Sequence, residues 1–121
     1  MAVAVGVVFS PGGKVYSFDP GALELGWNAK VICQTSRGRE YGRVVQPNHE
    51  LTDAGQAGRL KRVVRLATDE DEQHVRQNRD EAKRAMQAFR EAIAKHRLPV
   101  KPISAELVFD GSRLVLAYGA E

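Results

Sequence analysis

Arginines and an aromatic residue alternate with glycines along one short segment of this chain. Residues 37–43 read R-G-R-E-Y-G-R and carry three guanidinium groups and one phenol. A guanidinium fork can bind two phosphate oxygens at once, and an aromatic ring can stack on an unpaired base. The segment therefore predicts contact with RNA, and its candidate residues are Arg37, Arg39, Tyr41 and Arg43. The alternative is an ordinary solvated surface.

The basic character extends beyond this segment, although the net charge of the chain is only +3. Residues 37–65 hold seven lysines and arginines against three acidic residues. Lys14 and Tyr16 repeat the mixture of cation and aromatic ring earlier in the chain. Such stretches can neutralise phosphates, so we add Lys14 and Tyr16 to the candidate residues.

A third group of cations follows the long predicted helix. Cations recur every seven residues, and one more lies beside the row: Arg76, Lys83, Arg90 and Arg97, with Arg79. At about 100° per residue they form a stripe next to the apolar face. Glu72 and Asp80 can pair with some of them, but Arg79, Arg90 and Arg97 have no acidic residue four positions earlier. We expect these three to face RNA phosphates or an acidic partner, with a solvated face as the alternative.

No set of side chains predicts catalysis, a metal site or a cofactor. The three histidines are far apart, and none has a second histidine or cysteine at ligand spacing. Gly12, Gly13 and Lys14 lack the spacing of a phosphate-binding loop. The single cysteine, Cys33, lies in an alternating apolar segment and is expected to be buried and inert. We therefore expect a protein that is not an enzyme.

Hydrophobic periodicity predicts an α+β fold whose N-terminal half is antiparallel β, with SH3-like or partly open barrel character. Two hairpins are expected, from residues 3–9 with 14–18 and from 29–35 with 40–45. Phe18 is expected in the core, Trp27 is expected to cap one end of the sheet, and Tyr16 and Tyr41 are divided between core and surface. Residues 46–58 are predicted to be a loop, and residues 60–67 fit either a helix or a strand.

A long amphipathic helix is predicted over residues 69–97. Thr68 can cap it, acidic residues fill its first turn, and basic residues fill its last turn. One face is apolar and should pack against a sheet that includes a closing hairpin. That hairpin is expected around the turn at Asp110 and Gly111, because apolar residues alternate on both sides.

Two glycine-containing motifs indicate a family. Residues 9–21 read F-S-P-G-G-K-V-Y-S-F-D-P-G, and residues 35–45 read T-S-R-G-R-E-Y-G-R-V-V. Their order resembles the polymerase-suppressor-protein (PSP-one) C-terminal domain family, whose bacterial members include RicT/YaaT-like proteins. The likeness continues through residues 60–69, the helix and residues 106–110, and it favours a strand at 60–67. It implies a single PSP-one C-terminal-like domain over residues 1–121.

The resemblance implies a non-enzymatic regulatory adaptor in RNA processing. RicT-like proteins work with small helical partners, RicA and RicF, to direct ribonuclease Y in transcript maturation, and eukaryotic relatives bind messenger RNA elements. RNA is therefore a second expected partner beside these proteins. Two alternatives stay open: a pure protein-interaction scaffold, and a stand-alone nucleic-acid-binding module. The absence of a long apolar run and of a leader-like segment predicts a cytoplasmic protein.

Two departures from the family pattern limit this inference. RicT-like chains continue beyond the last hairpin into a further helix and a cysteine-rich segment associated with an iron–sulfur cluster. This chain has one cysteine, so no cluster is expected, and we interpret it as a truncated form or a fragment. Asn28 and Ala29 stand where relatives often have Gly-Asp, which should change the turn and keep the sheet.

Overall fold

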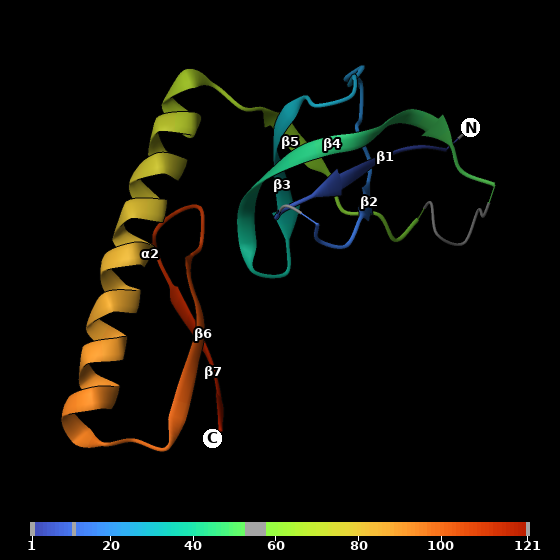
Figure 1. The fold of residues 1–121 in the computed structure, drawn as a ribbon. Coiled ribbons are helices and arrows are strands. Elements are labelled where there is room, and N and C mark those ends of the chain that lie inside the picture. Colours follow the sequence, from blue (N-terminus) through green and yellow to red (C-terminus); the bar gives the residue numbers. More distant parts are fainter. Residues whose placement is uncertain (1, 11, 53–57, 121) are drawn as a thin grey trace. The chain divides into compact units, whose positions relative to one another are not determined.

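The computed structural model describes residues 2–10, 12–52 and 58–120 (Figure 1). The chain divides into two compact units, residues 1–68 and residues 69–121. The first unit is a β structure, and the second contains a helix and a hairpin. Together they confirm the α+β fold class. One domain over residues 1–121 stays a prediction.

The first unit is a five-stranded antiparallel sheet with the strand order β2-β1-β4-β3-β5. Both expected hairpins are present, since β1 pairs with β2 and β3 pairs with β4. The segment that fitted either a helix or a strand contains β5, as the family resemblance favoured. The strands are β1 (Val3–Val8), β2 (Tyr16–Phe18), β3 (Lys30–Thr35), β4 (Gly38–Glu50) and β5 (Val63–Leu66).

The two edges of this sheet are joined by hydrogen bonds. The Asp19 N–H, just after β2, donates to the carbonyl of Lys61 at 2.8 Å. The Val63 N–H, at the start of β5, donates to the carbonyl of Asp19 at 2.9 Å. The sheet therefore curls into a small barrel, as the turn-rich sequence predicts.

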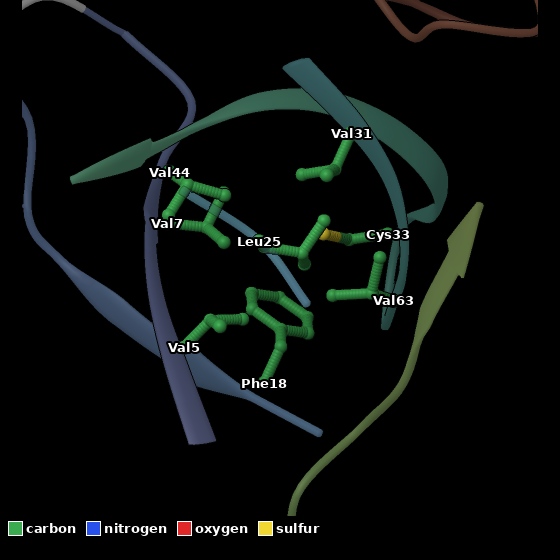
Figure 2. Close-up of a cluster of buried hydrophobic side chains, with 8 residues drawn as sticks. All are labelled: Val5, Val7, Phe18, Leu25, Val31, Cys33, Val44 and Val63. Atoms are coloured by element: carbon green, nitrogen blue, oxygen red, sulfur yellow. The ribbon is translucent and has the colours of Figure 1, made fainter. Parts of the chain in front are cut away.

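The inside of the barrel is a cluster of buried apolar side chains from all five strands and the β2–β3 connection (Figure 2). Phe18 lies in this core, as predicted. Cys33 is fully buried, which also confirms the prediction. Burial raises the pKa of the Cys33 thiol to about 12, and the nearby Glu40 carboxylate adds to the shift. The cluster consists of Val5, Val7, Phe18, Leu25, Val31, Cys33, Val44 and Val63.

The prediction of a loop from residue 46 onward is wrong for its first part, because β4 continues to Glu50. Gln46 pairs with Gly6 and His49 with Ala4, so two residues of β4 stand opposite one residue of β1. This bulge accommodates Pro47, which has no N–H to donate to a regular ladder. The part of the predicted loop at residues 53–57 lies outside the described residues.

The second unit consists of α2 (Asp69–His96), β6 (Val100–Leu107) and β7 (Leu114–Ala120). The helix packs against β6, and β6 pairs with β7 in the expected closing hairpin. A buried asparagine, Asn78, ties the two parts together, because its Nδ2 donates to the carbonyl of Phe109 at 2.9 Å. No helix in the described part of the chain combines the length and the apolar character needed to cross a membrane.

The helix ends one residue earlier than predicted. Arg97 lies outside it with a φ of 51°, in the left-handed region. The Leu98 N–H donates to the carbonyl of Ile93 at 3.1 Å, which is the hydrogen bond of a Schellman motif. Arg97 thus occupies the position after the helix cap that usually favours glycine.

Candidate nucleic-acid and partner interface

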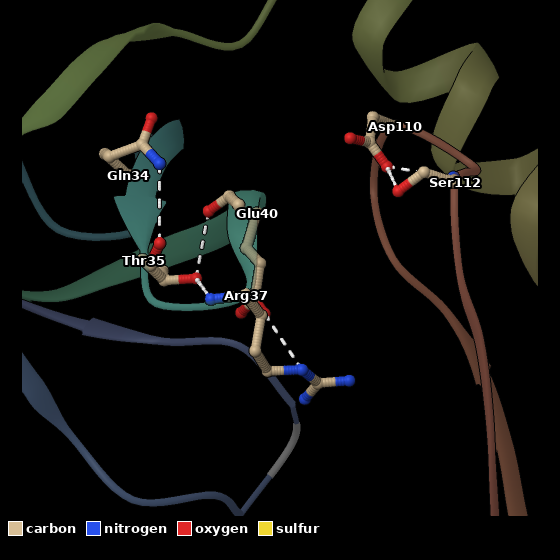
Figure 3. A network of polar contacts seen from close by, with 7 residues as sticks. Gln34, Thr35, Arg37, Glu40, Asp110 and Ser112 are labelled. Carbon is tan, nitrogen blue, oxygen red and sulfur yellow. Dashed lines mark hydrogen bonds and ion pairs between the residues drawn. The ribbon is translucent and has the colours of Figure 1, made fainter.

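The turn between β3 and β4 is fixed by one threonine side chain (Figure 3). The Thr35 Oγ1 accepts a hydrogen bond from the Arg37 N–H at 3.1 Å and donates one to the carbonyl of Gly38 at 2.9 Å. Gly38 has a φ of 107°, a conformation that few other residues adopt. The turn therefore presents Arg37 at its tip in a defined position.

Arg37 has an acidic partner within this turn. Its Nε lies 3.7 Å from the Oε1 of Glu40 (Figure 3). Both side chains are partly exposed, and ion pairs of this kind contribute only about 0–1 kcal/mol. A phosphate would have to compete with Glu40 for this guanidinium. Arg37 is thus a weaker candidate than its position in the sequence suggests.

The other three candidates of the segment lie on one face of β4. Arg39, Tyr41 and Arg43 are two residues apart, and alternate residues of a strand point to the same side. Arg39 is exposed, whereas Tyr41 and Arg43 are half-buried. The register places Lys30 of β3 directly opposite Arg43. We name Arg39, Tyr41, Arg43 and Lys30 the β4 face.

Gly42 lies between Tyr41 and Arg43 and points the other way, into the barrel. A Cβ atom at this position would lie 2.5 Å from Val7 Cγ1 and 2.9 Å from Phe9 Cε1. The sequence suggests that Gly42 lets the backbone approach a ligand. Its surroundings instead explain this glycine by packing against the core.

Trp27 is exposed, so the expectation that it caps the sheet is wrong. Its side chain retains 66% of its accessible surface. It lies in a turn that the Ala29 N–H closes by donating to the carbonyl of Gly26 at 3.2 Å. The guanidinium carbon of Arg43 lies 5.8 Å from the centre of the indole, within the range of a cation–π interaction. Trp27 therefore belongs beside the β4 face, although the sequence pattern did not select it.

Lys14 and Tyr16 form a separate pair. The Lys14 Nζ lies 5.5 Å from the centre of the Tyr16 ring, and that ring lies 6.0 Å from the Phe9 ring. Tyr16 is opposite the core residue Val7, whereas Arg43 is opposite Val8. Since neighbours on a strand point to opposite sides, the structure does not bring Lys14 and Tyr16 onto the β4 face.

The cations of the predicted stripe along α2 are exposed. Glu72 and Asp80 were expected to pair with some of these cations. Within the described ranges, however, no cation of the helix stripe makes an ion pair, and neither does Arg84. Four cations of the predicted stripe lie within α2, and we name them the basic flank: Arg76, Arg79, Lys83 and Arg90. Arg97 follows it, exposed, just beyond the helix.

Two further features of the described residues concern metal binding and a surface depression. No group of three or more histidine, cysteine, aspartate or glutamate side chains among them could hold a metal ion. An open depression of about 650 Å³ lies beside the bulge of β4. Its floor is fixed by Asn48, whose Oδ1 accepts from the Leu25 N–H at 2.8 Å and whose Nδ2 donates to the carbonyl of Leu23 at 2.9 Å. The Asn48 amide group therefore holds the backbone of residues 23–25 against β4.

Comparison with known proteins identifies the family. Residues 61–121 match the family model described as the PSP1 C-terminal conserved region. The chain belongs to this family. The match to the PSP1 region begins just before β5 and covers the whole second unit, which confirms the resemblance drawn from the sequence motifs.

A relative extends the PSP1 likeness to the first unit. The chain is 32% identical over 117 residues to the stage 0 sporulation protein YaaT of Bacillus subtilis (strain 168). The alignment covers 97% of this chain and 42% of YaaT, so the chain spans less than half the length of that relative. No solved structure matches the chain.

Proposed function

We propose that this PSP1-family chain is a non-enzymatic regulatory adaptor in RNA processing, which binds protein partners and RNA. The similarity to a sporulation protein supports a regulatory role. The observation that carries the proposal is a set of cations that are exposed on the basic flank and at Arg39, half-buried at Arg43 and Lys30, and without acidic partners among the described residues. Exposed cations that local carboxylates do not neutralise are available to phosphates or to acidic side chains.

The β4 face is the proposed RNA surface. Arg39 and Arg43 make no ion pair within the described residues, so their donors are available to phosphates. Phosphate contacts release counterions, and affinity for a single strand then falls with salt by a log–log slope of roughly 0.7 per contact. Changing Arg39 and Arg43 to glutamine should flatten this dependence.

The basic flank is the proposed partner surface. Arg76, Lys83 and Arg90 recur every seven residues, and they span about 21 Å of helix. Acidic residues at the same spacing on another helix would meet them in register. The family resemblance implies small helical partners similar to RicA and RicF, and we propose these proteins for the basic flank, with ribonuclease Y as the enzyme that the assembly directs.

Capture from a bacterial lysate, with and without ribonuclease treatment, tests the proposal. We expect ribonuclease to remove RNA while proteins held by the basic flank remain bound. Glutamine at Arg79 and Arg90 should release those proteins, and glutamine at Arg39 and Arg43 should release the RNA. If the chain captures proteins and binds no RNA even at low salt, it is a scaffold and the RNA half of the proposal is wrong.

A further inference from the structure

Trp27 is the single tryptophan of the chain, and in the described part of the chain it is the most exposed large hydrophobic residue. Most of its indole surface contributes nothing to the barrel core. An exposed large aromatic ring beside cations is common where a protein receives a planar ligand, because aromatic rings supply stacking area.

The backbone holds this indole in a fixed place. The Asn28 N–H donates to the carbonyl of Val44 at 2.7 Å, and the Val44 N–H donates to the carbonyl of Ala29 at 2.8 Å. Both bonds attach the Trp27 turn to β4. Asn28 has a φ of 72°, which suits the third residue of a type II turn, so Trp27 is the second residue and lies at the tip. A ligand would therefore meet a ring whose backbone is already ordered.

Two cations lie at the base of this turn. The Arg43 guanidinium lies by the indole, and within the described residues it makes neither an ion pair nor a side-chain hydrogen bond, which leaves five N–H donors. The Lys30 Nζ donates to the backbone carbonyl and to Oδ1 of Asn28, both at 3.0 Å. These bonds hold the ammonium next to the turn and use two of its three protons.

We propose that Trp27, Arg43 and Lys30 form a stacking platform for one unpaired base of single-stranded RNA. The base stacks on the indole, and the two cations bind the phosphates next to it. The inference rests on the RNA half of the proposed function and adds the site and the strand state. A duplex keeps its bases stacked on each other, so it offers the indole no free base face.

The unmodified chain provides the first test, because its only tryptophan is at the platform. We would titrate the 121-residue chain with an oligonucleotide of eight uridines and with an RNA duplex of the same length. Tryptophan fluorescence reports on Trp27, and the anisotropy of labelled RNA reports on binding anywhere. We expect the single strand to quench the fluorescence at the concentrations at which anisotropy rises, and the duplex to bind more weakly without quenching.

Variants give the second test. Trp27→Ala should weaken binding of the single strand roughly 5- to 150-fold, since a stacked base contributes about that range of affinity. Trp27→Phe should restore part of the affinity, and Arg43→Gln should lower both the affinity and its salt slope. Tyr118→Ala is the matched aromatic control, because Tyr118 is 62% exposed in the second unit. Arg84→Gln is the matched cation control.

The two readouts separate the possible failures. If labelled RNA binds while the fluorescence and the Trp27→Ala affinity stay unchanged, the platform is wrong and the RNA surface lies elsewhere. If neither readout responds at low salt, the RNA half of the proposed function fails together with the platform. If the duplex quenched the Trp27 fluorescence as strongly as the single strand, the choice of an unpaired base would be wrong. If a proline-rich peptide quenched the fluorescence and RNA did not, the choice of RNA would be wrong. Unchanged melting temperatures would show that the variants fold.

Discussion

Gly42 of β4 faces Val7 of β1 so closely that a Cβ atom on the glycine would lie 2.5 Å from Val7 Cγ1. Val7 is fully buried and cannot move away without disturbing the core. We expect Gly42→Ala to lower the free energy of unfolding by about 1–3 kcal/mol, as overpacked cores do. Urea denaturation of both proteins would measure the difference.

Gly58→Ala is the matched control for this change. Among the described residues, no atom outside the two adjacent residues lies within 4 Å of a Cβ built at Gly58, so this variant should unfold at nearly the same urea concentration as the original chain. A loss of stability for Gly58→Ala equal to that for Gly42→Ala would contradict the packing explanation.

The buried thiol of Cys33 predicts a loss of stability at high pH. Burial raises its pKa to about 12 from an ordinary 9.0. Between these values the unfolded chain releases the proton and the folded chain keeps it. The thiol contribution to stability therefore falls as pH rises through this window, by up to about 1.4 kcal/mol per pH unit. Cys33→Ala should lose this component of the slope when denaturation is measured from pH 8 to 11.

Thiol labelling checks the same residue independently. A small disulfide reagent should modify Cys33 in the folded chain far more slowly than in urea, because the thiolate that reacts is rare and shielded. Equal rates in the two states would mean that Cys33 is accessible.

The basic flank of α2 should contribute to binding and not to stability. Arg79 and Arg90 are exposed and make no ion pair in the described part of the chain. Changing both to glutamine should alter the free energy of unfolding by less than about 0.5 kcal/mol. Affinity for the captured protein partner should fall roughly 2- to 30-fold. The same change at Arg84 and Lys95, which are exposed and lie outside the basic flank, removes equal charge and should leave binding intact.

The end of the helix predicts a stabilising substitution. Arg97 has a φ of 51°, which costs free energy for any residue with a Cβ. Arg97→Gly should therefore raise the free energy of unfolding by about 0.5–1 kcal/mol. Arg97→Ala removes the same charge but keeps the Cβ, so it should show no gain. Thermal melts of the two variants separate the backbone effect from the charge effect.

The sequence predicted most elements because local signals were strong. Alternating apolar residues and glycine turns marked the hairpins, and the caps and charges of residues 69–96 marked the helix. The secondary-structure prediction was wrong at Gln46–Glu50, because the proline and asparagine in this segment indicate a loop. The bulge opposite β1 depends on a partner strand that is distant in sequence, and such pairing is not visible in local composition.

The same limit applies to the candidate site. Alternation along the predicted strand was enough to place Tyr41 and Arg43 on one face, whereas Arg39 was expected in the turn, because the predicted strand began at residue 40 and β4 begins at Gly38. The contact of Arg43 with Trp27 was not predictable, because it depends on a turn that returns the chain to β4. The ion pair between Arg37 and Glu40 could have been predicted from the sequence, since the two residues are only three positions apart across the turn.

The hydrogen bonds between Asp19 and residues 61–63 also determine when the barrel can form. During synthesis, β1 to β4 emerge from the ribosome before the strand that joins the two sheet edges. The nascent chain therefore exposes an open sheet edge until residue 63 has left the exit tunnel. Contacts over such sequence distances form slowly compared with a helix. We expect the N-terminal segment alone to be prone to aggregation, and the arrival of β5 to end that vulnerable period.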